Sequence, residues 1–189
     1  MKNESCRDHA IMKYVALFRG INVGGHHLLP MRNLKDLLLG LQCNNVESYI
    51  QSGNVIFECK EQPREELRRK IEERIDAQFH FRPKVLLLDE KAFRNAVTKN
   101  PFPVNQGKAL HFFFLDTQPF HPDSEKLAVL KAQSEEFKLH KELFYLYAPD
   151  GIGRSKLASN VEKCLGVSAT ARNWNTVQKL IDMLDRGRF

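Results

Sequence analysis

The sequence YVALFRGINVGG, residues 14–25, joins a short apolar run to a polar, glycine-rich continuation. Residues 14–18 are all apolar, which predicts a buried β-strand, and Arg19 and Gly20 end the run. Pro30 then precedes leucines at the spacing of one helix face, and proline is favoured at the start of a helix. We therefore predict a strand, a glycine-rich loop and a helix in this part of the chain.

Four further elements complete a unit of known topology. Residues 46–50 and 55–57 are strand-like and flank a polar link of hairpin length that contains Gly53. Apolar residues at every fourth position of 67–79 predict a helix, and 85–88 form another apolar, strand-like run. The order strand, helix, strand, strand, helix, strand is that of the split βαβ, or ferredoxin-like, motif.

The second half of the chain repeats this order of elements. A bridging helix over 90–99 and a link over 100–108 containing proline and glycine precede the repeat. The predicted elements are a strand at 110–115, a helix at 122–133, strands at 137–140 and 143–147, a helix at 157–165, a strand at 167–172 and a closing helix at 177–184. We therefore predict an α+β chain of two ferredoxin-like subdomains, 12–99 and 100–189, with antiparallel sheets and helices on one face of each.

The composition excludes several classes of protein. With 189 residues, of which 42% are hydrophobic and 28% charged, the chain is neither disordered, fibrous nor coiled-coil in character. Its apolar runs fall short of the roughly 18 to 20 residues that span a bilayer, and residues 1–10 lack the apolar centre of a secretory signal. We therefore expect a cytoplasmic protein without a membrane partner.

Charged, cysteine and histidine residues give no sign of a nucleic-acid stripe or a metal. The net charge is +6, but the densest charged stretch, 64–82, mixes both signs and is typical of a solvated helix face. The four cysteines are far apart in sequence, and no ligand-type residue follows His26 and His27 at metal-binding spacing. We predict no metal and no cofactor.

Two polar segments of the first half are expected to meet. In a split βαβ unit the first strand is parallel to the first hairpin strand, so the segments that leave these two strands lie at one end of the sheet. Glycines let backbone N–H groups approach a ligand, and an arginine can bind a carboxylate or phosphate, although a simple tight turn would need some of the same residues. The candidate ligand-binding residues are Arg19, Asn22, Gly24, Gly25, Gln51, Ser52 and Asn54.

The same topology predicts a second candidate site in the other half. Residues 150–156 and 172–176 both follow strands that run in the same direction, and the first segment opens a helix whose N-terminus attracts anions. Ser155 could instead be only a helix cap, and Trp174 could fill the core instead of stacking on a ligand. The candidate residues are Arg154, Ser155, Lys156, Arg172, Asn173, Trp174 and Asn175.

Four strings in this order resemble one protein family: YVALFRGINVGG, ESYIQSGNVIF, GRSKL and ATARNWNTVQKL. They are similar to the motifs of a bacterial family known as domain of unknown function 1697, and the resemblance runs from about Met12 to the C-terminal helix. It implies two intertwined ferredoxin-like subdomains, no established activity, and an N-terminal extension over 1–11 that could be disordered. The motif positions that carry over are Arg19, Gly20, Asn22, Gly24, Gly25, Gln51, Ser52, Gly53, Asn54, Ser155, Lys156, Arg172, Asn173, Trp174 and Thr176.

Three functions are compatible with these residues. The first is the binding of a small anionic or nucleotide-like ligand by the glycine, arginine, lysine and asparagine loops. The second is an enzyme of phosphoryl or acyl transfer or hydrolysis that uses the same loops, with its catalytic residues unassigned. The third is the binding of single-stranded nucleic acid on exposed sheet aromatics, although the usual RNA-binding signature is missing. The oligomeric state is left open.

Overall fold

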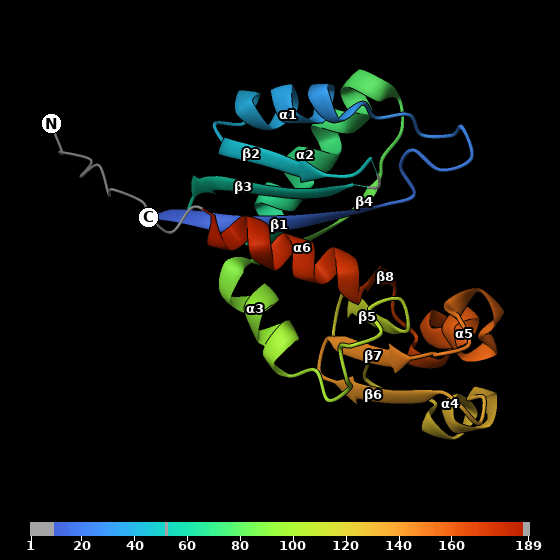
Figure 1. Cartoon of the computed structure of the whole chain (residues 1–189). Helices are drawn as coiled ribbons and strands as arrows, with labels where there is room; N and C mark the ends of the chain where they lie inside the picture. Colours follow the sequence, from blue (N-terminus) through green and yellow to red (C-terminus); the bar gives the residue numbers. More distant parts are fainter. Residues whose placement is uncertain (1–9, 52, 187–189) are drawn as a thin grey trace, which may run out of the picture. The chain divides into compact units, whose positions relative to one another are not determined.

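A computed structural model describes residues 10–51 and 53–186 of the chain (Figure 1). The contacts within it divide the chain into two compact units, one that ends at Phe93 and one that begins at Arg94. This division falls inside helix α3 (Glu90–Thr98), whereas the sequence suggested a division after Lys99. Residues 1–9 of the expected N-terminal extension lie outside the described residues, and the first strand begins at Ile11.

The first unit has the predicted order of strands and helices. Its elements are β1 (Ile11–Arg19), α1 (Met31–Gly40), β2 (Asn44–Tyr49), β3 (Asn54–Lys60), α2 (Arg64–Phe79) and β4 (Lys84–Asp89). The four strands form an antiparallel sheet in the order β2-β3-β1-β4. This is the ferredoxin-like arrangement, in which β1 and β2 run in the same direction and end at the same edge of the unit.

The core of the first unit fixes which side chains face the helices. Alternate residues of β1, namely Tyr14, Ala16 and Phe18, are buried in one cluster with Leu34 of α1 and Ile71 of α2. Because successive side chains of a strand point to opposite faces, the residues between and after them face away from both helices. Arg19 is one of these residues.

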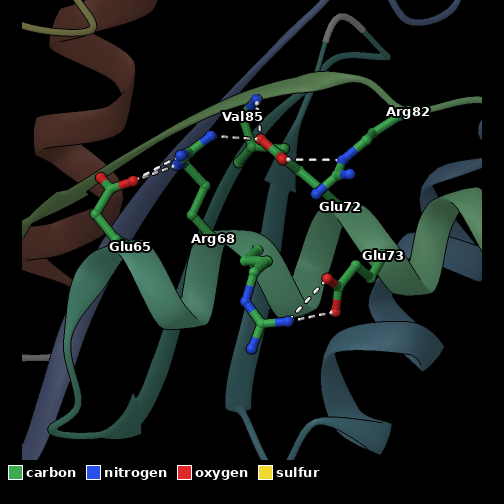
Figure 2. A network of polar contacts seen from close by, with 7 residues as sticks. Glu65, Arg68, Glu72, Glu73, Arg82 and Val85 are labelled. Carbon is green, nitrogen blue, oxygen red and sulfur yellow. Dashed lines mark hydrogen bonds and ion pairs between the residues drawn. The ribbon is translucent and has the colours of Figure 1, made fainter.

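A charge network fastens α2 to β4, as Figure 2 shows. The buried carboxylate of Glu72 accepts hydrogen bonds from Arg68 at 2.9 Å, from Arg82 at 3.3 Å and from the backbone N–H of Val85 at 3.4 Å. Further pairs along the helix are Arg68–Glu65, Arg69–Glu73 and Lys70–Glu66. Arg68, Arg69, Lys70 and Arg82 are therefore each paired with a glutamate, as the mixed charges of residues 64–82 suggested.

The second unit repeats the topology. After α3 it contains β5 (Leu110–Leu115), α4 (Ser124–Leu130), β6 (Glu136–His140), β7 (Leu143–Tyr147), the 3₁₀ helix η1 (Ile152–Arg154), α5 (Lys156–Leu165), β8 (Ala169–Asn173) and α6 (Trp174–Asp185). Its antiparallel sheet has the order β6-β7-β5-β8. The predicted α+β fold of two ferredoxin-like sheets is confirmed.

Both faces of the second sheet are buried. On one face Phe113 and Phe144 share a cluster with Leu127 of α4 and Leu157 of α5. On the other face Phe112 and Tyr145 are also buried, and the Tyr145 hydroxyl donates a hydrogen bond to the backbone carbonyl of Ala96 at 2.7 Å. These strand aromatics are therefore core residues, which leaves them unable to stack on the bases of a nucleic acid.

Candidate functional site

At one end of the first sheet, the loop after β1 lies against the turn between β2 and β3. The backbone N–H of Phe18 donates to the carbonyl of Gly53 at 2.8 Å, and the side-chain amide of Asn22 donates to the carbonyl of Gln51 at 2.8 Å. The prediction that these two segments meet is confirmed. We call this region, which comprises Arg19, the loop of residues 20–29, the turn residues Ile50, Gln51 and Gly53, and Lys84, the first sheet end.

Asn22 holds the first sheet end together through its side chain. Besides its bond to Gln51, its amide donates to the carbonyl of Leu29 at 2.9 Å, and its Oδ1 accepts from the backbone N–H of Leu29 at 2.8 Å. A φ of 55° places Asn22 in the left-handed region, which asparagine tolerates better than most residues. The side chain is thus bonded to backbone at both its nitrogen and its oxygen, so its role is to shape the loop.

Glycines form the tip of this loop. Val23 accepts a backbone hydrogen bond from His26 at 3.1 Å, which closes a tight turn over Gly24 and Gly25. Their φ values of 60° and 78° are those of a type I′ turn, which requires positive φ at both central residues. The turn geometry alone accounts for the two glycines.

His27 anchors the loop on the helix side of the unit. Its Nδ1 hydrogen-bonds with the carbonyl oxygen of Gly20 at 3.0 Å, and its ring stacks on Phe81 with centroids 4.7 Å apart. Phe81 itself packs on the core of the first unit. The imidazole is therefore a packing residue whose Nδ1 is already engaged.

Gly53 and Asn54, which lead from the turn into β3, are equally constrained. Gly53 has a φ of 77°, and a Cβ at this position would lie 2.6 Å from the Cβ of Phe18. Asn54 is buried and its side-chain amide donates to the carbonyl of Tyr49 at 3.2 Å. Gly53 and Asn54 therefore serve the packing of the turn, Gln51 is exposed, and the predicted residue Ser52 lies outside the described residues.

Two cations lie side by side at the first sheet end. Arg19 of β1 is the register partner of Lys84 of β4, and both side chains are exposed. Their neighbours Phe18 and Val85 point into the core beneath α1 and α2, so Arg19 and Lys84 share the opposite face. Two side chains that carry positive charge therefore lie opposite each other on adjacent strands.

Lys84 is not among the site residues that the sequence patterns predict. The apolar residues 85–88 predicted β4 but not its register against β1, and the register is what brings Lys84 opposite Arg19. The ferredoxin-like strand order carried a usable signal, because β4 starts where its antiparallel neighbour β1 ends.

In the second unit, Ser155 is the N-cap of α5. Its Oγ accepts a hydrogen bond from the backbone N–H of Ala158 at 2.9 Å. This contact favours the interpretation of Ser155 as a helix cap over that of an anion ligand. Arg154 and Lys156 on either side are exposed. α5 packs on the face of the second sheet that contains Phe113, because Leu157 belongs to that cluster.

The segment after β8 is largely committed to structure. Asn173 caps α6 by accepting from the N–H of Thr176 at 3.0 Å, and Trp174 stacks on Phe112 with centroids 5.9 Å apart. A Cβ on Gly107 would collide with the side chain of Asn175, so the loop before β5 lies against the start of α6. Each of these contacts favours the packing alternative for Asn173, Trp174 and Asn175.

Arg172 lies on the opposite face of the second sheet from α5. Ala171 belongs to the same core cluster as Leu157 of α5, and the side chain of the next strand residue points the other way. Burial lowers the pKa of the Arg172 guanidinium to about 10, and Nη1 donates to the carbonyl of Ala171 at 2.9 Å. Strand alternation thus places Arg172 and helix α5, which begins at Lys156, on different faces of the second sheet.

Residues 10–51 and 53–186 contain neither a candidate metal site nor a candidate membrane-spanning helix. In these residues no three His, Cys, Asp or Glu side chains gather into a group that could hold a metal ion. Within the same described stretch, no helix combines the length and the apolar character needed to cross a membrane.

Known proteins resemble the chain in fold and in sequence. A solved structure of a conserved bacterial protein from Streptococcus pneumoniae superposes with a TM-score of 0.69 and 25% identity, over 93% of this chain and 99% of the other. Residues 11–145 match the model of the family described as protein of unknown function DUF1697, and the chain belongs to this family. None of the curated proteins compared with the chain matches it. The matched residues include the whole first sheet end and stop before Ser155.

Proposed function

We propose that the chain binds a small anionic ligand at the first sheet end. The observation that carries the proposal is the cross-strand pairing of Arg19 with Lys84 on one exposed face. A guanidinium offers a planar pair of donors to a carboxylate or phosphate, and an ammonium group beside it adds a second charge.

The backbone around these cations supports the proposal because it is held in place before any ligand arrives. Asn22 ties the loop to the β2–β3 turn, and Gly53 packs tightly against Phe18. A site that is already ordered loses little conformational entropy on binding, so modest contacts can give measurable affinity. This rigidity favours a binding site over a surface charge pair without function.

The anionic group is the part of a nucleotide-like ligand that this site would recognise. The alternative of an enzyme for phosphoryl or acyl transfer needs a nucleophile or base beside the anion, and His27 Nδ1 is already bonded to Gly20. The alternative of single-stranded nucleic-acid binding needs exposed sheet aromatics, and Phe112 and Tyr145 are buried. Anion binding is therefore the function that the residues support best.

Calorimetric titration with pyrophosphate and with adenosine monophosphate tests the proposal. We expect saturable binding by the wild-type chain, weakened about 10- to 100-fold in Arg19→Gln and in Lys84→Gln, because each loses a charge-assisted hydrogen bond of about 1.5–3 kcal/mol. Lys156→Gln removes the same charge from the second unit and serves as the matched control, with unchanged affinity expected. Equal binding by all four proteins, or no binding by the wild type, would refute the proposal.

A further inference from the structure

Three exposed aliphatic side chains surround the point where Asn22 joins the loop to the turn. Val23, Leu28 and Ile50 are 66%, 64% and 53% exposed. Each is next in sequence to a residue whose backbone or side chain takes part in the Asn22 contacts: Val23 follows Asn22, Leu28 precedes Leu29 and Ile50 precedes Gln51. Since consecutive Cα atoms are about 3.8 Å apart, the backbones of these three residues lie near the Asn22 contacts, and we call the three residues the aliphatic tip.

Ile50 is unfavourable for the isolated chain in two ways. Its φ of 50° lies in the left-handed region, where a β-branched residue is a rare outlier and glycine or asparagine would be comfortable. It is also a large apolar side chain in contact with water. A residue that costs both backbone strain and apolar exposure points to a contact made with something outside the chain.

The aliphatic tip and the cations belong to one continuous region. Arg19 is three residues before Asn22, a separation of at most about 10 Å along the chain. The loop between β1 and α1 projects past the ends of the strands in Figure 1, so a ligand can reach it from solvent. Cations and exposed aliphatic residues are therefore close along the chain at the first sheet end.

We infer that the first sheet end binds an amphiphilic anion, with its phosphate or carboxylate on Arg19 and Lys84 and its aliphatic chain against Val23, Leu28 and Ile50. This inference rests on the proposed function and names the class of ligand. The charge complementarity with the cations selects an anionic head, and the aliphatic tip selects an alkyl chain over a polar or charged tail. The proposed ligand is a small molecule dissolved in water, and not a membrane or a second copy of the chain.

A series of alkyl phosphates tests the inference. Methyl, butyl and hexyl phosphate are titrated separately into the wild-type protein below their aggregation concentrations. Complete burial of a methylene strengthens binding about fourfold, so we expect affinity to rise by up to about that factor for each added methylene. In Ile50→Asn we expect a clearly smaller gain in affinity from methyl to hexyl phosphate than in the wild type.

Ile50→Asn also separates a binding role from a structural one. Asparagine suits a φ of 50°, so the thermal midpoint of this variant should equal or exceed that of the wild type. Val129→Asn, which replaces an aliphatic residue of α4 that is 83% exposed, is the matched control and should leave the chain-length dependence intact. A gain with chain length that is the same in Ile50→Asn as in the wild type would overturn the inference.

The arms of this experiment distinguish the two proposals. If methyl phosphate fails to bind, the proposed anion site itself is refuted. If methyl phosphate binds but affinity does not rise with chain length, only the amphiphilic inference falls. Binding to phosphatidylglycerol vesicles without binding of hexyl phosphate, or self-association that Ile50→Asn abolishes, would also overturn it, because the tip would then contact a membrane or a second copy.

Discussion

The two sheets have the same topology, but their corresponding ends are built differently. At the first sheet end, Asn22 joins the loop after β1 to the β2–β3 turn, and Arg19 and Lys84 share one face. At the second, α5 begins on one face while Arg172 points to the other. The topology decides which strand ends lie together, whereas the alternation of side chains along each strand decides whether their residues can contact one ligand.

The largest difference in stability between the two sheet ends is expected when Asn22 and Asn173 are each replaced by alanine. In Asn22→Ala the buried N–H and C=O of Leu29 lose their partner and alanine must adopt a φ of 55°, so we expect a loss of about 4 kcal/mol in the free energy of unfolding. In Asn173→Ala only a helix cap is lost, at about 1 kcal/mol. Urea denaturation followed by circular dichroism measures both, and equal losses would show that Asn22 does not organise the loop.

Replacing a glycine should also destabilise the first sheet end more than the corresponding end of the second sheet, but by a smaller difference than for the asparagines. Gly53→Ala combines a φ of 77° with a Cβ 2.6 Å from that of Phe18, and we expect a cost of about 3 kcal/mol. Gly151→Ala has a φ of 95° but open space around the new methyl group, so about 1 kcal/mol is expected. The difference between the two urea midpoints checks this, and a Gly53→Ala protein as stable as Gly151→Ala would contradict the tight contact with Phe18.

The smallest expected effect is on the pH dependence of stability. It reports on the end of the second sheet, where β8 leads into α6. His111, the register partner of Asn173, is buried, and burial lowers its pKa below the ordinary value of 6.5. The folded state therefore favours the neutral imidazole, and this contribution to stability is complete above pH 6.5 and is lost as the pH falls below it. Urea midpoints between pH 8 and pH 5 should decline less in His111→Gln than in the wild type. An identical decline would mean that this histidine is not desolvated.

Much of the fold was predictable from local patterns in the sequence. The apolar run at Tyr14–Phe18 and the four-residue spacing in α2 each identified an element, because burial imposes those periods on one chain segment. Ile50 was predicted as a strand residue, but β2 ends at Tyr49 since Ile50 has a positive φ. Apolar pattern alone does not report backbone conformation in a turn.

The candidate site was predictable only in part, for a different reason. Strand direction correctly brought Gln51 to the loop that follows Arg19. The pairing with Lys84 depends on register, and the position of Arg172 relative to α5 depends on which face of the sheet each occupies. Both are relations between distant segments that no local motif encodes.

Nuclear magnetic resonance tests the central claim, that the first sheet end binds anions, most directly. Glycine amides mark both ends of the comparison: Gly20, Gly24, Gly25 and Gly53 at the first, and Gly151 and Gly153 before α5. During titration of ¹⁵N-labelled protein with pyrophosphate, we predict saturable shifts of the first group and stationary resonances for the second. Saturable shifts confined to Gly151 and Gly153, or no saturable shift in either group, would contradict the claim.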